Sequence, residues 1–306
     1  MSDITASMNA PGITAPIVRR PRKGRRGLSR LLSKATPFTW VVFAAALVTL
    51  LGAAIGPALV SFDPDAQTLL ARLRPPLGFD RAMASHPLGT DELGRDMLSR
   101  TLHGLRLTLV IALTGSVISL VVGGITGILA GYLRGFVPAF IMAVVDIQIA
   151  VPFTLIALLV VAIFGNSLPV LICVIGLSGW EVYARVMRAQ VMTVSRQPFV
   201  EAARAAGASH LRILLRHVLP NVVSPIIVVW TMTFSGLILL ESSLSFLGLG
   251  VQPPTATLGS MVGSGRDYLA TNPWIAVVPS VAIMFVSLLV LLIGDWLRDA
   301  LDVKLK

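Results

Sequence analysis

The sequence predicts an all-α, polytopic membrane protein with six transmembrane helices, and two observations carry this prediction. Of the 306 residues, 55% are hydrophobic and only 13% are charged, which is more apolar content than one soluble core can bury. The apolar residues also gather in runs that reach or approach the roughly 20 residues needed to cross the hydrocarbon layer. These runs are residues 38–60, 107–131, 137–164, 168–186, 222–240 and 274–294.

The runs divide the chain into predicted segments. These are a basic tail (1–36), a first transmembrane helix (37–61), an external loop (62–104), a five-helix core (105–296) that includes an internal loop (187–220), and a short tail (297–306). The first run is about twice as long as the apolar core of a signal peptide and further runs follow it, so it is predicted to be an uncleaved helix. The fourth run contains Gly176, Gly179 and Glu181, but the topology requires it.

The distribution of basic residues predicts that both termini are cytoplasmic. Short cytoplasmic loops of membrane proteins carry an excess of Lys and Arg. Most of the 25 Lys and Arg residues lie in the two tails and in loops 132–136 and 187–220, which six crossings place on one side. This arrangement accounts for the net charge of +10, so nucleic acid is not an expected partner. The basic tail itself is expected to be largely disordered.

The external loop contains the polar stretch HPLGTDELGRDMLSR, residues 86–100. This pattern predicts a helix at the membrane surface. Thr90 suits the position that caps such a helix, and Asp91 and Glu92 lie favourably in its first turn. Its predicted membrane-facing side consists of Leu93, Met97 and Leu98.

The internal loop contains the stretch EAARAAGASHLRILLRHVLPN, residues 201–221, which predicts two short amphipathic helices. Pro198 suits the first turn of one helix, and Gly207 suits its end. The second helix is predicted to start near Ser209 and to end at Pro220. Its apolar stripe consists of Leu211, Leu214, Leu215 and Val218, and its charged face carries Arg212 and Arg216. Amphipathicity alone fits a pair of helices lying among lipid headgroups.

The order of residues in this loop is more specific. Glu-Ala-Ala, three residues, Gly, and then His-Val-Leu-Pro closely resemble the cytoplasmic EAA loop of importer permeases of the ATP-binding-cassette (ABC) class. His217 followed by Val218 is similar to the peptide-importer branch of that family. The stretches HPLGTD with GRD, ESSLSFLGLGVQPP and GDWLRDALD also resemble this branch. The resemblance covers residues from about 35 to 303 and implies a type I ABC importer permease fold, most like the second permease of the dipeptide, oligopeptide and nickel group.

The resemblance implies a set of partners and a coupling site. A homologous permease would complete a heterodimer in the bacterial inner membrane, two cytoplasmic ABC ATPase subunits would bind ATP and magnesium, and an extracytoplasmic solute-binding protein would deliver a peptide. Nickel complexes and glutathione are alternative substrates. The residues expected to couple this chain to the ATPase are Glu201, Ala202, Ala203, Arg204, Gly207, Arg212, Leu219 and Pro220.

The sequence offers no catalytic or metal site of its own. A phosphate-binding loop needs GxxxxGK followed by Ser or Thr, and none of the lysines, Lys23, Lys34, Lys304 and Lys306, follows a glycine. The four histidines have no spacing that suits a metal site, and neither HExxH nor GxSxG occurs. A non-catalytic subunit without a cofactor is therefore expected. The single cysteine, Cys173, lies in an apolar run and is interpreted as a packing residue.

Three carboxylates lie in or beside the apolar runs. Asp146 is the candidate for the substrate pathway because ionisable groups are costly in a bilayer, although a pair with an arginine or a cap near Pro152 explains it more simply. Glu181 is expected to pair with Arg185 at i+4, and Glu241 is expected at the membrane surface. An ion-coupled secondary transporter using Asp146 and Glu241 is the rival hypothesis, but it leaves the EAA loop unexplained.

Overall fold

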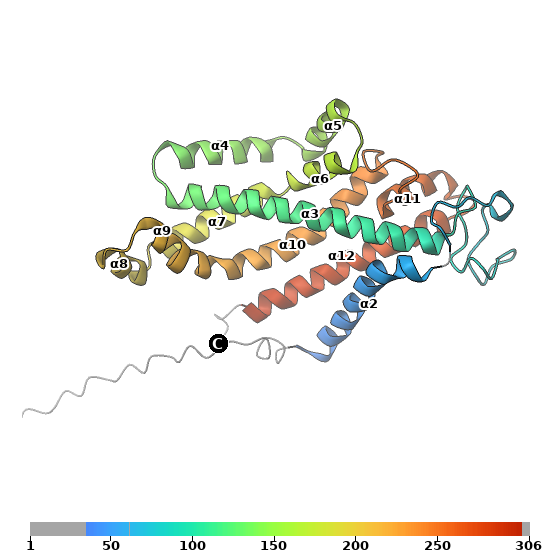
Figure 1. The fold of residues 1–306 in the computed structure, drawn as a ribbon, viewed down its shortest axis with the longest axis horizontal. Helices are drawn as coiled ribbons and strands as arrows, with labels where there is room; N and C mark the ends of the chain where they lie inside the picture. Colours follow the sequence, from blue (N-terminus) through green and yellow to red (C-terminus); the bar gives the residue numbers. More distant parts are fainter. Residues whose placement is uncertain (1–34, 61, 302–306) are drawn as a thin grey trace, which may run out of the picture. The chain divides into compact units, whose positions relative to one another are not determined.

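The computed structural model describes residues 35–60 and 62–301; the basic tail and the end of the C-terminal tail lie outside the described residues. All regular elements in the described part are helices, as the sequence predicts (Figure 1). Five helical stretches are long and apolar enough to cross a membrane, and there are six if the bent pair α4 and α5 counts as one span. The first is α2 (Pro37–Leu59), whose N-terminus is capped by Thr36.

The second span, α3 (Met97–Tyr132), begins earlier than predicted, and the surface helix predicted at Thr90 is absent from the described loop. Thr90 instead forms an isolated bridge with Asp96, and Asp96 caps α3 by accepting a hydrogen bond from the Ser99 amide at 2.7 Å. The predicted membrane-facing Met97 is buried. Asp91 and Glu92 are engaged by arginine side chains rather than by a helix N-terminus. The loop before α3 also contains a short 3-10 helix, η1 (Leu69–Ala71).

The third predicted span is broken into two helices. α4 (Phe136–Ala150) and α5 (Phe153–Phe164) meet at an angle of 91°. Pro152 lies at the break, and Val151 before it is extended, with φ −96° and ψ 127°. Proline has no amide hydrogen and disfavours a helical residue before it, so a continuous helix cannot form there.

The fourth span consists of α6 (Leu168–Gly176) and α7 (Trp180–Ser195), so it is longer than predicted. Gly179 joins the two helices with a left-handed φ of +80°. Cys173 on α6 is exposed on this chain, so the interpretation as a buried packing residue is wrong.

A seam of small residues holds α7 against α3. Gly123, Gly127 and Gly131 recur at every fourth position of α3, and a Cβ at Gly127 would lie only 2.6 Å from the Ala184 carbonyl oxygen of α7. The α7 backbone therefore approaches α3 more closely than any side chain would permit, as is typical of small-residue helix contacts in membranes. The two helices form the central pair of the described chain (Figure 1).

The remaining spans pack beside this pair. The chain continues through α8 (Pro198–Ala205), α9 (His210–Ile213) and the π-helical turn η2 (Leu214–Val218) into α10 (Leu219–Phe246). After α10 come α11 (Leu258–Gly265), η3 (Arg266–Tyr268) and α12 (Trp274–Leu301), and α12 contacts α10, α11 and α2. In Figure 1, α8 and α9 lie at one end of the spans, and the loop before α3 lies at the other.

Candidate functional site: the α8–α9 end

The predicted pair of short helices is present, and its first member is closed at both ends. Pro198 occupies the first turn of α8, and Gly207 follows its end with a left-handed φ of +76°. The Gly207 amide donates to the Arg204 carbonyl at 3.0 Å and the Ala208 amide donates to the Ala203 carbonyl at 3.1 Å. These two bonds form a Schellman motif, which satisfies carbonyls that a helix end leaves free. The predictions for Pro198 and Gly207 are confirmed.

The second helix does not end at Pro220 as predicted. It runs from His210 through η2 into α10 as one continuous helical stretch that ends at Phe246. The π-helical turn at Leu214–Val218 lies just before the proline, and the Leu219 amide bonds to the Leu214 carbonyl. Widening the helix by one residue relieves the clash between the Pro220 ring and the preceding turn. α9 is therefore continuous with a membrane span.

The inner face of the α8–α9 pair is packed onto the ends of α7 and α10. Val200 and Ile213 are fully buried in a cluster with Val191 and Val218, and Ala203 and Leu214 pack on its edge. The predicted apolar stripe is partly wrong, because Leu211 and Leu215 are 65% and 55% exposed. The pattern also missed Ile213, which is the buried residue of α9.

The outer face is exposed and chemically mixed. Small residues of α8, the exposed leucines and three charged side chains share it, and Glu201, Arg204 and Arg212 form no ion pair with any described residue. The residues exposed here are Glu201, Ala202, Arg204, Ala205, Ala206, Gly207, Leu211, Arg212 and Leu215. Small residues permit close approach by another protein, and unpaired charges and exposed leucines on a rigid support are typical of a docking surface.

The structure separates the predicted coupling residues into two groups. Glu201, Ala202, Arg204, Gly207 and Arg212 belong to the outer face. Ala203 and Leu219 support it from behind by packing on the buried cluster, and Pro220 is exposed in the first turn of α10.

A polar contact ties this site to the central helix pair. The Tyr132 hydroxyl at the end of α3 donates to the His210 carbonyl at 3.1 Å, and the two rings meet edge to face. Because α3 is packed tightly on α7, the α8–α9 pair is connected to three spans at once: α3, α7 and α10.

Comparison with known proteins identifies the kind of protein to which this site belongs. The family described as "Binding-protein-dependent transport system inner membrane component" matches residues 123–306, which include the whole α8–α9 site. The chain is a member of this family. It is thus a permease component of an importer in the inner membrane.

Relatives of known annotation agree with this family. The permease is 43% identical over 83% of its length to a di/tripeptide transport system permease protein DppC of Pseudomonas aeruginosa (strain UCBPP-PA14), of which 84% is covered. It is 35% identical over 85% of its length to a dipeptide transport system permease protein DppC of Haemophilus influenzae, covering 88% of that protein. A glutathione transport system permease protein GsiD of Escherichia coli O1:K1 / APEC is 40% identical over 72% of this chain and 73% of the relative.

The fold also has a solved counterpart. A chain of the MetNI methionine ABC transporter, determined in inward-facing conformations, matches with a TM-score of 0.55 at 20% identity. The match covers 65% of the permease and 95% of that chain. The likeness shows that the permease has the fold of an ABC importer permease, as the EAA loop implies.

The predicted pathway candidate lies in a polar cluster between α4 and α7. Arg185 donates to Asp146 at 2.6 Å, so the predicted arginine pair is confirmed. The expected pair of Arg185 with Glu181 does not form; Glu181 instead accepts a hydrogen bond from Gln148 at 3.2 Å, and the Trp180 indole donates to Gln148. Sequence reasoning missed Gln148, although a polar residue two positions after Asp146 in an apolar run was a usable signal.

This cluster is exposed on the isolated permease. The side chains of Asp146 and Arg185 are 64% and 51% exposed. A charged pair at membrane depth is costly against lipid, so this face fits a partner protein or a water-filled path.

Glu241, which is expected at the membrane surface, is buried within the protein with no exposed area. Ser245 donates to its carboxylate at 2.7 Å, and the hydroxyls of Thr108 and Thr257 also bond to it. These partners belong to α10, α3 and the cap of α11. Glu241 therefore joins three elements, and its partners Thr108 and Thr257 are too distant in sequence to have been predicted from the local pattern.

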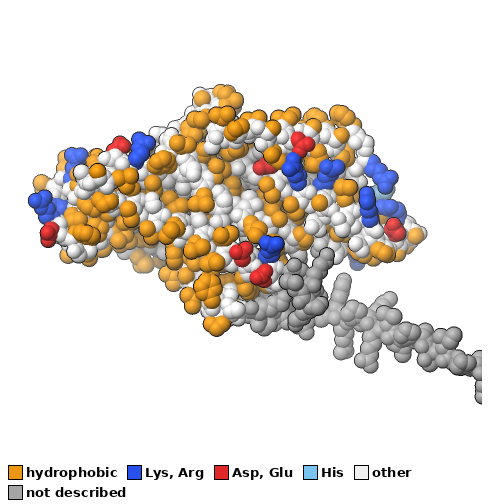
Figure 2. Space-filling view, turned by 180° about the vertical axis from the view of Figure 1, so that it is seen from behind, with side chains coloured by type: hydrophobic (Ala, Val, Ile, Leu, Met, Phe, Trp, Pro, Cys, Tyr) orange, Lys and Arg blue, Asp and Glu red, His pale blue; other side chains and the backbone are white. Residues whose placement is uncertain are grey.

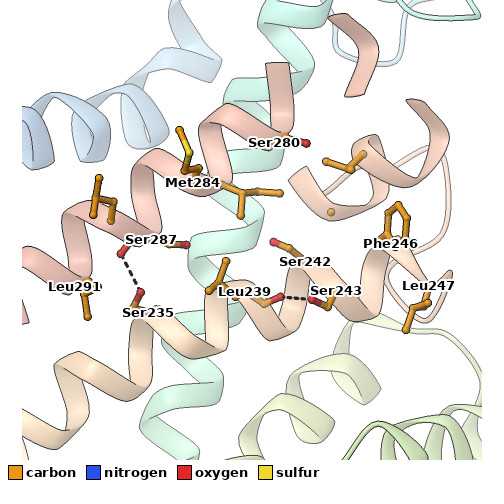
Figure 3. A pocket seen from close by; sticks show the side chains of 14 residues that line it. Ser235, Leu239, Ser242, Ser243, Phe246, Leu247, Ser280, Met284, Ser287 and Leu291 are labelled. Atoms are coloured by element: carbon orange, nitrogen blue, oxygen red, sulfur yellow. Dashed lines mark hydrogen bonds between the residues drawn. The ribbon is translucent and has the colours of Figure 1, made fainter. Parts of the chain in front are cut away.

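A groove of about 690 Å³ lies between α10, α11 and α12 (Figure 3). Two of its serines use their hydroxyls within the protein: Ser235 donates to the Ser287 carbonyl at 2.9 Å, and Ser243 donates to the Leu239 carbonyl at 2.8 Å. The Ser287 hydroxyl is buried without a hydrogen-bond partner among the described residues. The groove therefore presents mainly apolar side chains, including Met284 and Leu291, to whatever fills it. Such a surface suits helix packing rather than selective binding of a polar substrate.

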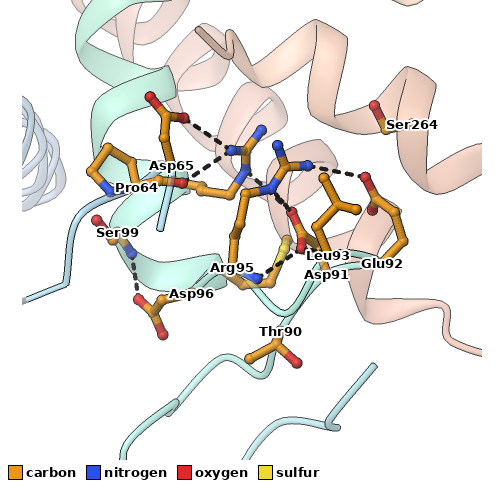
Figure 4. Close-up of polar contacts among 12 residues, drawn as sticks. Pro64, Asp65, Thr90, Asp91, Glu92, Leu93, Arg95, Asp96, Ser99 and Ser264 are labelled. Atoms are coloured by element: carbon orange, nitrogen blue, oxygen red, sulfur yellow. Dashed lines mark hydrogen bonds and ion pairs between the residues drawn. The ribbon is translucent and has the colours of Figure 1, made fainter. Parts of the chain in front are cut away.

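The loop before α3 is held by a buried network of charges (Figure 4). Arg95 bonds to Asp91 at 2.6 Å and to Glu92 at 3.0 Å, and Arg100 lies 3.4 Å from both Asp91 and Asp65. Nearby, His86 pairs with the capping residue of α3, Asp96, at 2.9 Å. The described residues contain no group of three or more His, Cys, Asp or Glu that would hold a metal ion. These charged side chains therefore hold the loop in place by pairing with one another.

Proposed function

We propose that this permease imports peptides, and that it does so as half of a heterodimeric pathway driven by two separate ATPase subunits that dock on the outer face of α8 and α9. The observation that carries the coupling role is that face itself: exposed small residues and unpaired charges on a rigidly packed base. The relatives named for dipeptides and di/tripeptides support the substrate class. The glutathione permease makes glutathione, itself a small peptide, the second candidate.

The exposed surfaces of the spans support a second permease subunit. Charges on α4 and α7 and the apolar groove between α10 and α12 are incompletely covered by this chain. A homologous subunit would cover such surfaces and form the other wall of the pathway. An external binding protein would deliver the substrate at the end opposite the α8–α9 pair.

The proposed mechanism follows from the connections of the site. When the ATPase subunits close on ATP, they move the α8–α9 pair. The pair passes this motion to α10 through the continuous helix and to α3 through Tyr132 and His210. Because α3 and α7 are locked by their glycine seam, the spans tilt together and open the pathway alternately to each side.

The proposal places α8 and α9, and with them both termini, in the cytoplasm. Single cysteines test this placement in a Cys173→Ser background, since the native thiol is exposed. In intact cells an impermeant thiol reagent is expected to label Gln67→Cys in the loop before α3 and to spare Ala206→Cys, while permeabilised cells that do not express the ATPase subunits label both. External labelling of Ala206→Cys contradicts the topology.

Docking on the outer face is tested by one exposed position. Ala202 is exposed on α8, whereas the adjacent Ala203 packs on the protein's own cluster. We expect Ala202→Asp to abolish binding of the ATPase subunits and stimulated ATP hydrolysis in reconstituted membranes, while the partner permease still co-purifies. Ala202→Ser keeps the small size and serves as the matched control. Normal hydrolysis by Ala202→Asp would show that this face is not the docking site.

The substrate class is tested separately in the same reconstituted importer. The binding protein is loaded in turn with a dipeptide, a longer peptide or glutathione, and ATP hydrolysis and uptake are measured. We expect dipeptides to stimulate both most strongly. Stimulation by glutathione alone would replace the peptide assignment with the second candidate and leave the coupling role intact.

A further inference from the structure

A second feature of the α8–α9 end adjoins the docking face and shares Glu201 and Arg204 with it. A cavity of about 900 Å³ opens between the end of α3, the start of α4, the end of α7, and the α8–α9 pair. Four arginines and one histidine line it, against a single acidic residue, Glu201. The basic residues are Arg134, Arg188, Arg196, Arg204 and His210. Figure 2 shows arginine side chains gathered at this end of the spans.

The charges of this cavity are not neutralised by the described part of the permease. None of the four arginines forms an ion pair with a described residue, although Glu201 lines the same cavity. Two atoms of its lining residues, Arg188 Nε and Ser195 Oγ, are buried without a hydrogen-bond partner among the described residues. Buried donors without partners are uncommon because each loses its hydrogen bonds to water. The positive charge and the free donors of these residues suit an anion that accepts several hydrogen bonds.

We propose that this cavity binds the phosphate headgroup of an anionic phospholipid of the inner leaflet. The remaining lining is apolar and includes Leu133, Pro138 and Met192. The cavity also lies at the ends of two spanning helices, α3 and α7, where headgroups meet the hydrocarbon layer. A mixed lining of this kind suits an amphiphile, with its phosphate on the arginines and its chains along the apolar wall.

The start of α4 supports a lipid over a soluble anion. Phe136 and Phe140 stack with ring centroids 5.9 Å apart, and they are 78% and 57% exposed. Exposed phenylalanine rings beside basic residues suit insertion at the boundary between headgroups and acyl chains. Basic pockets between helices on the cytoplasmic side are also suited to anionic headgroups. A bound headgroup would join α3, α7 and α8 and hold the coupling helices in place when the ATPase subunits are absent.

The test uses the purified complex with its partner permease and ATPase subunits. Native mass spectrometry measures how tightly the complex retains dioleoyl phosphatidylglycerol compared with the zwitterionic dioleoyl phosphatidylcholine. Arg134→Gln with Arg196→Gln removes two exposed cavity arginines without disturbing buried packing. Because each basic residue near an anionic surface contributes about a fivefold change in affinity, we expect phosphatidylglycerol binding to weaken about 25-fold. Arg188→Gln is expected to add to this loss.

The matched control removes two arginines outside the cavity. Arg216 and Arg298 are both exposed, and neither lines it. Arg216→Gln with Arg298→Gln is expected to retain phosphatidylglycerol like the unchanged complex. Equal loss in this control, or no loss in the cavity variant, overturns the proposal.

Two further outcomes would assign the cavity to another occupant and overturn the proposal that it binds a lipid. If the cavity variant keeps its lipid but loses the ATPase subunits, the arginines serve carboxylates of that partner. If inorganic phosphate binds with the same arginine dependence in phosphatidylcholine vesicles and lipid does not compete, the site takes a free anion. The inner leaflet is named here because of the sidedness given under the proposed function. Retention of the lipid by the purified complex depends neither on that sidedness nor on the transported substrate. A failure of the lipid proposal can therefore be distinguished from a failure of the proposed function.

Discussion

Arginine side chains at the two ends of the permease differ in how their charges are neutralised. In the loop before α3, Arg95 and Arg100 are each 8% exposed at the side chain and bond to Asp91. At the α8–α9 end, Arg204 and Arg212 are exposed and pair with none of the described residues. The same residue type therefore orders the chain at one end and remains available to a partner at the other.

This difference predicts which substitutions harm the permease itself and which harm only its assembly. Breaking a buried pair leaves the remaining charge without a partner and destabilises the fold. Altering an exposed, unpaired residue leaves the fold intact and changes binding alone. The following predictions test the comparison, beginning with the largest effect.

The largest effect is expected from Asp91→Ala. Its carboxylate bonds to Arg95 at 2.6 Å and lies 3.4 Å from Arg100, so its removal takes the closest acceptor from one buried cation and a neighbouring negative charge from the other. We expect a loss of about 3 to 5 kcal/mol in stability, seen as a lower unfolding temperature and faster proteolysis of the loop. Asp65→Ala is the control, because Asp65 is 42% exposed at the side chain and reaches only Arg100. Similar small effects of both variants would mean that the network does not hold the loop.

The next effect concerns Gly207. Its φ of +76° is left-handed, and no atom within 4 Å would obstruct an added Cβ, so conformational strain alone decides the result. A β-branched residue in this region is strained by more than the roughly 1 to 2 kcal/mol of an ordinary side chain. We expect Gly207→Val to displace the end of α8 and abolish ATPase association without unfolding the spans.

Gly207→Asn separates strain from contact at the same position. Asparagine tolerates left-handed backbone better than other residues with a side chain. We therefore expect Gly207→Asn to retain most ATPase binding in a pull-down. Equal loss of ATPase binding in both variants would indicate that the partner contacts position 207 directly. Normal binding by Gly207→Val would show that the left-handed end of α8 is not needed for coupling.

A smaller effect is expected from Arg212→Gln on the outer face. Exposed ion pairs contribute about 0.2 to 1 kcal/mol, so ATPase binding is expected to weaken by at most about fivefold. The loss is expected to shrink as salt rises, because salt screens exposed charges. Arg216→Gln is the control on the same helical stretch, outside the predicted coupling set. Identical salt-dependent losses would indicate a general attraction to the basic end rather than a specific contact.

The parts of the structure that the sequence predicted depend on local signals. Pro198 and Gly207 bound α8 because proline and glycine act on their own backbone, and the apolar runs identify the spans through composition. Two further local signals were present but were not used to predict the shape and packing of the spans. Pro152 lies within the third run and breaks it, and the fourfold spacing of Gly123, Gly127 and Gly131 marks the seam with α7.

The rest depends on neighbours that only the fold supplies. Arg185 pairs with Asp146, 39 positions away, instead of with Glu181 on its own helix. Glu241 is buried because Thr108 and Thr257 meet it from other elements. The cavity likewise collects arginines from α7, the α3–α4 loop and α8, so their spacing in the sequence gives no sign that they share a site. Local periodicity predicts helices, but it does not predict which of their polar groups meet.

The smallest effect is expected from Asp146→Asn, which tests the comparison at a pair that shares features of both ends. Asp146 and Arg185 are paired like the arginines before α3, yet both are more than half exposed like the residues of the α8–α9 face. An exposed pair contributes only about 0 to 1 kcal/mol, so we expect Asp146→Asn, Arg185→Gln and their combination to fold and assemble equally well. Uptake and its pH dependence are expected to persist, because the pair holds α4 on α7 without contacting the substrate. If Asp146→Asn assembles normally but abolishes uptake in reconstituted membranes, then the exposure of Asp146 reflects contact with the pathway. In that case pairing within the chain would not by itself distinguish a structural charge from a functional one.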